Sequence, residues 1–86
     1  MATLQDLSKA VIEGKKNRAV KISQALVDDG VAPLDVINNG LIAGMTEVGV
    51  RFKAGQMFVP EVLMAAEAMS AGSELVKPML NAEDLP

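Results

Sequence analysis

The stretch RFKAGQMFVPEVLMAA, residues 51–66, decides how this 86-residue chain folds. It predicts the end of one helix, a tight turn and the start of another helix. Gly55 suits the position just past a helix end, where the backbone often needs positive φ. Pro60 suits the first turn of a helix, where its missing N–H needs no partner. Residues 57–59 (Met-Phe-Val) are apolar, although an exposed turn usually carries Ser, Asn or Asp. Such a corner either closes its own core or presents an apolar surface to something else.

Apolar periodicity on both sides of this corner predicts four helices. They run from about Thr3 to Glu13, from about Lys16 to Asp28, from about Leu34 to Lys53, and from about Pro60 to Lys77. Thr3 begins a weak capping box with Asp6 at the start of the first helix. The third helix has the clearest apolar stripe: Leu34, Ile37, Leu41, Met45, Val48 and Phe52. Because the connections are short, we expect an all-α fold, an antiparallel four-helix bundle.

Three glycines lie inside the predicted third helix: Gly40, Gly44 and Gly49. Each costs about 1 kcal/mol of helix stability relative to alanine, so a compensating reason is expected. Gly40 and Gly44 share one face of the helix. We therefore expect another backbone to approach this face closely.

The predicted fourth helix carries more apolar surface than one bundle core needs. Its polar residues form a single narrow stripe: Glu67, Ser70, Glu74 and Lys77. Nearly all its other residues are Val, Leu, Met or Ala, which makes the apolar arc unusually wide. The excess predicts a ligand-binding face or a subunit interface.

Composition excludes several classes of function. The net charge of −3 argues against nucleic acid as a partner, because no basic patch offsets phosphate repulsion. No apolar run is long enough to span a membrane and no signal pattern is present, so a cytoplasmic protein is the default expectation. His and Cys are absent, which removes the commonest general base, the thiol nucleophile and the usual metal ligands. We therefore expect no self-contained enzyme, no catalytic residue and no metal site.

A spaced set of motifs resembles a known family. GMTEVG at 44–49 is followed by Arg51-Phe52, by GQMFVP at 55–60, and by Ala65-Ala66 with Met69. This pattern resembles the N-terminal helical cap of corrinoid proteins, which include the cobalamin-binding region of methionine synthase and the corrinoid shuttle proteins of methanol and methylamine methyltransferase systems. The resemblance runs from Ala10 to Met79. It implies that residues 1–80 form a cap domain and that 81–86 are a linker toward a cobalamin-binding α/β domain.

In that family the cap is a four-helix bundle over the upper face of the corrin ring. Its apolar side chains shield the methyl–cobalt bond from water until a partner methyltransferase displaces the cap. By motif position, the cap-contact residues fall on Phe52, Val59 and Val62. Val59 stands at a position where the family can carry Leu. The resemblance thus implies cobalamin as the cofactor of the full-length protein, with the α/β domain and methyltransferase subunits as partners.

One departure from the family is large. The corrin is gripped mainly by the following α/β domain, whose D-x-H-x-x-G motif supplies the lower-face histidine ligand, and this chain has no His. The resemblance therefore implies a cap and not a complete cofactor protein. We expect these residues alone to bind cobalamin weakly or not at all.

Other interpretations of the same residues remain open at this stage. Phe52 ends the apolar stripe of the third helix and would then pack inside the core, while Met57 and Phe58 would close the end of the bundle. Glu47 and Arg51 are expected to form a surface ion pair. As a whole, the chain could instead be a self-associating interaction module, a homodimer joined through its fourth helix. An acyl carrier is a weaker alternative, because the helix start PLDV at 33–36 lacks the serine that would carry phosphopantetheine.

Overall fold

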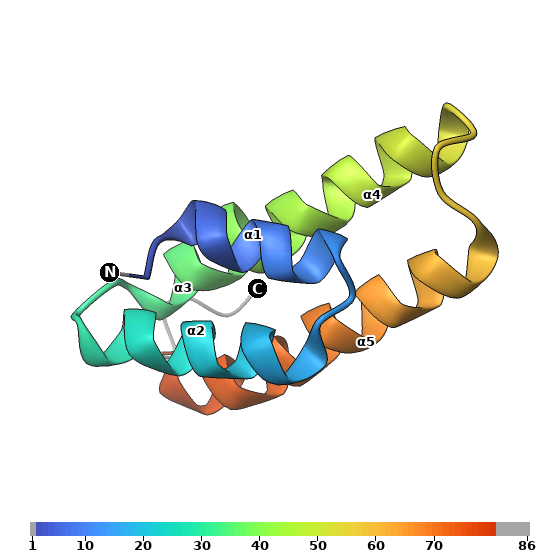
Figure 1. Cartoon of the computed structure of the whole chain (residues 1–86). Helices are drawn as coiled ribbons and strands as arrows, with labels where there is room; N and C mark the ends of the chain where they lie inside the picture. Colours follow the sequence, from blue (N-terminus) through green and yellow to red (C-terminus); the bar gives the residue numbers. More distant parts are fainter. Residues whose placement is uncertain (1, 81–86) are drawn as a thin grey trace.

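The computed structural model describes residues 2–80, and every helix in this range lies close to its predicted position. The elements are α1 (Leu4–Ile12), α2 (Lys16–Asp28), α3 (Pro33–Val36), the π-helical η1 (Ile37–Ile42), α4 (Ala43–Lys53), α5 (Val59–Val76) and the 3-10 helix η2 (Lys77–Met79). Since α3, η1 and α4 follow one another without a break, they form one continuous helical segment. Successive segments run in alternating directions (Figure 1). The prediction of an all-α, antiparallel four-helix bundle is confirmed for the described residues; the predicted linker 81–86 lies outside them.

Local signals in the sequence explain where α1 begins and where the chain turns into α2. The Thr3 hydroxyl accepts a hydrogen bond from the Asp6 N–H at 3.0 Å, and the Asp6 carboxylate accepts one from the Thr3 N–H at 3.0 Å. This is a complete capping box, which satisfies two backbone donors at the start of α1. Gly14 has a φ of +68° just after α1 and lets the chain turn into α2.

The third segment differs from the prediction in one respect. Val36 is fully buried, whereas Leu34, predicted to belong to the apolar stripe, is 37% exposed. The reason is the π-helical η1, whose hydrogen bonds span five residues instead of four. Val36 lies five residues before the buried Leu41, so the π spacing brings Val36 into the core and turns Leu34 out. The predicted stripe is right from Ile37 to Val48 and wrong at Leu34 and Phe52.

The core is aliphatic, and small residues let the helices approach one another. Its buried apolar side chains are Leu7, Ala10, Val11, Ala19, Ile22, Leu26, Val36, Leu41, Val48, Met57, Ala65, Ala68 and Val76. A Cβ placed on Gly40 would lie 2.6 Å from the Leu7 side chain, and one on Gly44 would lie 2.8 Å from the Ser8 carbonyl oxygen. Both glycines therefore face α1 at close range. This confirms the close backbone approach that the sequence predicts for their shared face.

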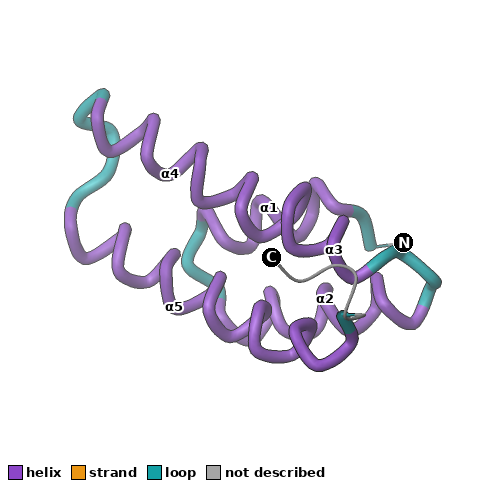
Figure 2. The backbone as a smooth tube through the Cα atoms, turned by 180° about the vertical axis from the view of Figure 1, so that it is seen from behind, coloured by secondary structure: helices purple, strands orange, loops and turns teal. Residues whose placement is uncertain are grey.

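The α4–α5 hairpin is the feature that positions the candidate site. Helix α2 packs along α5, and α1 packs against η1 and α4, but both cover only part of the hairpin. Beyond them α4, α5 and their connecting turn project at one end of the molecule, as Figures 1 and 2 show from opposite sides. The result is a flattened body with extents of 38 × 30 × 16 Å. No helix within residues 2–80 combines the length and hydropathy needed to cross a bilayer.

Candidate functional site

The turn between α4 and α5 is held by backbone hydrogen bonds. The Gln56 N–H donates to the Arg51 carbonyl at 2.8 Å, and the Gly55 N–H donates to the Phe52 carbonyl at 3.0 Å. With Gly55 at a φ of +77°, these two bonds form a Schellman motif, which satisfies the last carbonyls of α4. The prediction that Gly55 ends the helix is confirmed.

The apolar residues of the turn point in different directions. Met57 is only 7% exposed and closes the end of the core, whereas Phe58 is 72% exposed. The Phe58 N–H donates to the Glu61 carboxylate at 2.9 Å, which fixes the start of α5. The interpretation that these residues close the bundle is therefore right for Met57 and wrong for Phe58.

The three residues singled out by motif position lie on the projecting hairpin. Phe52, in the last turn of α4, is 47% exposed, and Val59, the first residue of α5, is 56% exposed. Val62 is half-buried and packs against the core. The alternative in which Phe52 packs inside the core is wrong, because about half of its surface is open to solvent. Phe52 and Val59 thus flank the turn as large, accessible apolar side chains.

These residues belong to a longer apolar surface that we call the open face. It consists of Ile42, Met45, Gly49 and Phe52 on the third segment and of Val59, Val62, Ala66 and Met69 on α5. Each set steps by three, four and three residues, the spacing that places side chains on one face of a helix. Sequence reasoning missed five of the eight as site residues, although this shared spacing was available to find them. The assignment of Met45 to the core stripe is right as well, because Met45 packs against the core at the border of this face.

The open face is turned away from α1 and from the α1–α2 turn. On α4, Gly44 meets α1, and Gly49 lies five residues further on, about 140° around the helix. On α5, Met64 lies beside the turn, because a Cβ on Gly14 would be 2.8 Å from the Met64 Cβ. Val62 precedes Met64 by two residues, about 160° around the helix. Gly49 on α4 and Val62 on α5 are therefore both turned away from α1 and from the α1–α2 turn, on two helices that pack against each other.

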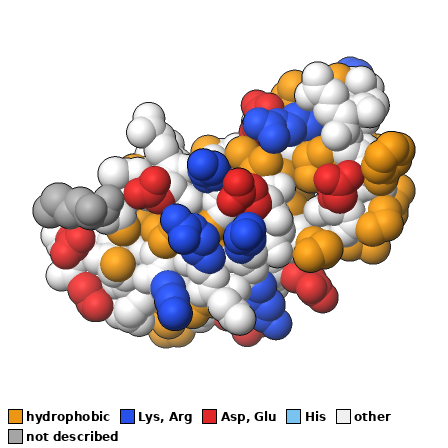
Figure 3. Space-filling view, viewed as in Figure 1, with side chains coloured by type: hydrophobic (Ala, Val, Ile, Leu, Met, Phe, Trp, Pro, Cys, Tyr) orange, Lys and Arg blue, Asp and Glu red, His pale blue; other side chains and the backbone are white. Residues whose placement is uncertain are grey.

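Charged side chains also lie on the hairpin that carries this surface, among them Glu47, Arg51 and Glu61. Hydrophobic side chains gather where α4 and α5 join, while acidic and basic side chains intermingle over the rest of the visible face (Figure 3). The predicted ion pair is present: the Arg51 Nε lies 2.9 Å from a Glu47 carboxylate oxygen, and both side chains are partly exposed. At this exposure such a pair contributes little to stability.

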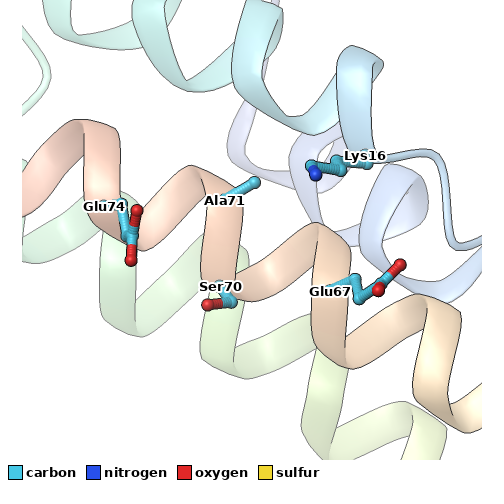
Figure 4. Close-up of a pocket in the computed structure, with 5 residues that line it drawn as sticks. All are labelled: Lys16, Glu67, Ser70, Ala71 and Glu74. Atoms are coloured by element: carbon cyan, nitrogen blue, oxygen red, sulfur yellow. The ribbon is translucent and has the colours of Figure 1, made fainter.

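A shallow hollow of about 210 Å³ lies between α2 and α5. Lys16 lines it from the start of α2, and Glu67, Ser70, Ala71 and Glu74 line it from α5 (Figure 4). Glu67 and Glu74 lie two helical turns apart, so their carboxylates do not converge on one point. Within residues 2–80 no group of three or more His, Cys, Asp or Glu side chains is placed to hold a metal ion. The open face is therefore the better candidate site.

The fold and this surface define a small helical domain with an apolar face available to a ligand or to a second domain. The profile of the family described as the B12 binding domain matches residues 3–77. The chain belongs to this family.

Three relatives illustrate the match. The dimethylamine corrinoid protein of Methanosarcina barkeri is 42% identical over 77 residues, which are 90% of this chain and 36% of that protein. The crystal structure of the methanol:cobalamin methyltransferase complex MtaBC from Methanosarcina barkeri contains a chain with a TM-score of 0.85 and 34% identity, over 92% of this chain and 31% of that one. The structure of the Methanosarcina barkeri monomethylamine corrinoid protein matches with a TM-score of 0.82 and 32% identity, over 85% of this chain and 34% of that one. The chain thus spans about a third of the length of the relatives it matches.

Proposed function

We propose that this chain is the cap of a corrinoid methyl-carrier protein and that its open face covers the upper face of cobalamin. The observation that carries the proposal is the uncovered apolar surface on the α4–α5 hairpin, with Phe52 and Val59 about half exposed beside the turn. Family membership and the corrinoid proteins among the relatives support it. The cap itself performs no catalysis. Its partners are a corrinoid-binding α/β domain and methyltransferase subunits.

The residues present fit one side of such a cofactor. Phe52, Val59 and Val62 offer apolar surface without hydrogen-bonding groups, which suits contact with a broad ring and excludes water from it. The chain has no His, so it lacks the residue that would serve as a lower-face ligand. Cobalamin, when bound, supplies the cobalt that carries the methyl group. The fit is therefore to the upper face only.

The turn keeps the contact residues in place. Its Schellman bonds tie Gly55 and Gln56 to the end of α4, and the bond from the Phe58 N–H to Glu61 fixes the beginning of α5. Met57 fills the space between the two helix ends. Phe52 and Val59 are thus presented by rigid elements, which lowers the entropy lost when they meet a ring.

The energetics predict weak binding by the isolated chain. Burying one such side chain fully contributes roughly 1.5–3 kcal/mol, and three of them together contribute about 5–9 kcal/mol. Association of two free molecules costs an estimated 4–15 kcal/mol. With the association cost at the lower end of its range, a net of about −4 kcal/mol remains, which corresponds to a dissociation constant in the millimolar range. A covalent link to an α/β domain would supply a millimolar effective concentration and make the contact persistent.

An NMR titration of the 86-residue chain with methylcobalamin tests the proposal. Backbone amide shifts are expected to concentrate on residues 42–52 and 59–69. The double variant Phe52→Ala/Val59→Ala should abolish them, whereas Val50→Ala should not, because Val50 is 58% exposed on the side of α4 opposite Phe52. No localised shift at several millimolar cofactor (about the effective concentration of a linked domain) would overturn the proposal. Micromolar affinity would contradict the energetic argument instead.

A second candidate function is self-association into a homodimer. Phe58, Leu63 and Met64 are 72%, 61% and 54% exposed, although none of them belongs to the open face. Exposed apolar side chains in such number are typical of an interaction surface. Sedimentation of the chain at high concentration tests this role. A purely monomeric chain would remove it, and a dimer that Leu63→Glu dissociates would support it.

A further inference from the structure

We propose that Gly49 is a corrin-contact position, where the missing side chain lets the ring lie against the backbone of α4. The inference rests on the proposed function and adds a residue to it. It begins from a question that the packing of the chain leaves open, namely why an exposed position in the middle of a helix is glycine.

The other glycines inside the helices have a packing reason. A Cβ on Gly40, Gly44 or Gly72 would lie 2.6, 2.8 or 2.7 Å from its nearest neighbour, closer than real Cβ contacts come. Each of them makes room for a neighbouring element. Gly49 does not, because a Cβ placed there would meet nothing within 4 Å.

Backbone conformation does not require glycine at position 49 either. The positive-φ glycines of the described chain are Gly14, Gly30 and Gly55, and Gly49 lies within the regular helix α4. Alanine is a much better helix former and would fit the space. The reason for glycine therefore lies outside the folded chain itself.

The place of Gly49 on the surface indicates what that reason is. It lies between Met45 and Phe52 on the open face, one helical turn from each. The opposite row on α5 places another small residue, Ala66, after the half-buried Val62. Gly49 is thus a gap in a row of larger apolar side chains. A broad, flat ring that rests on these side chains comes closest to the helix backbone at this gap.

The test compares Gly49→Ala with the unmodified chain and with Val50→Ala, by thermal unfolding and by NMR titration with methylcobalamin. Gly49→Ala is expected to raise the midpoint of thermal unfolding by roughly 4–8 °C, because alanine favours the helix. Its affinity for methylcobalamin is expected to fall at least about fivefold, because the added methyl group occupies the contact. Val50→Ala should leave the affinity unchanged. A variant that is more stable and binds less cannot be explained by damage to the fold.

The outcomes separate this inference from the proposed function. If methylcobalamin leaves the open face of the unmodified chain unshifted, the proposed function fails and Gly49 with it. If the unmodified chain binds and Gly49→Ala binds equally well, only the role of Gly49 is overturned. If Gly49→Ala retains its affinity but weakens self-association in sedimentation, the gap fits a second copy of the chain, and the corrin contact is likewise overturned.

Discussion

The two sides of the α4–α5 hairpin use similar residues for opposite purposes. On the side covered by α1 and α2, Gly44 makes room for Val11 and Gly72 makes room for Leu41, and both of these larger side chains are fully buried. On the open face, a Cβ added at Gly49 would meet no other atom within 4 Å, and Phe52 remains 47% exposed. Small residues thus bring helices together on one side, while on the other they leave an apolar surface without a partner in the chain.

This difference separates the residues that should determine stability from those that should determine binding. Burial of apolar surface stabilises the fold, so residues on the covered side should determine the free energy of unfolding. The exposed residues of the open face, such as Ile42, Phe52 and Val59, gain little from folding and should affect what the surface contacts. Substitutions on the two sides can therefore test whether stability and binding depend on different residues.

The largest effect is expected for Leu41→Ala. Leu41 is fully buried and lies against Gly72, so its truncation should leave a cavity and lower the free energy of unfolding by about 2–5 kcal/mol. The matched control is Ile42→Ala, because Ile42 is the next residue and is 45% exposed on the open face. It should cost less than about 1 kcal/mol. Urea unfolding measures both, and equal losses would contradict the division between a stabilising side and a binding side.

The next effect is a difference in sign between two glycines of the same segment. Gly44→Ala places a methyl group 2.8 Å from the Ser8 carbonyl oxygen, and overpacking of this kind typically destabilises by about 1–3 kcal/mol. Gly49→Ala should instead stabilise by up to about 1 kcal/mol, since it gains helix propensity without a clash. Both are measured by urea unfolding. If both variants gain stability, α1 does not restrict the covered side as closely as the structure indicates.

How much of this the sequence could predict depends on how local each signal is. The ends of the helices follow from Thr3, Gly14 and Gly55, whose roles involve neighbours within a few residues. The π-helical turn is not local in this sense. It brings Val36 into the core in place of Leu34 where η1 packs against α1, with Gly40 facing Leu7, and no periodicity in the third segment reveals that partner.

The exposure of Phe52 was hidden for a related reason. Phe52 continues the stripe of Leu41 and Val48 in phase, so the pattern alone places it in the core. Helices α1 and α2 do not cover the projecting end of the hairpin, where Phe52 lies (Figure 1). Only the resemblance to corrinoid caps singled out Phe52, Val59 and Val62 together, and their contact with cobalamin stays a prediction.

A smaller effect is expected where α2 meets α5 on the covered side. Ser23 is fully buried, and among the described residues its hydroxyl oxygen is a buried polar atom without a hydrogen-bond partner. Such a group carries a desolvation penalty, so Ser23→Ala should raise the free energy of unfolding by about 1 kcal/mol. Thermal and urea unfolding test this, with Ser70→Ala as the control because Ser70 is exposed on α5. A loss of stability would contradict this prediction, because it would show that the hydroxyl contributes to the fold.

The smallest effect on folding is expected for Val59→Ala. Val59 is 56% exposed at the start of α5, so its truncation should change the free energy of unfolding by no more than about 0.5 kcal/mol. Val76→Ala is the matched control in the same helix. Val76 is fully buried, and the loss of its two methyl groups should cost at least about 1.5 kcal/mol.

Binding should rank this pair in the reverse order. Val59→Ala is expected to lower the affinity for methylcobalamin severalfold, because it removes apolar area from the open face at about 0.8 kcal/mol per methylene equivalent. Val76→Ala should leave the affinity of the folded fraction unchanged, since Val76 is fully buried and lies two helical turns beyond Met69, the last residue of that face on α5. The same NMR titration measures both. If the two variants lose stability and affinity in parallel, the open face is not a separate binding surface, because its residues would then act only through the fold.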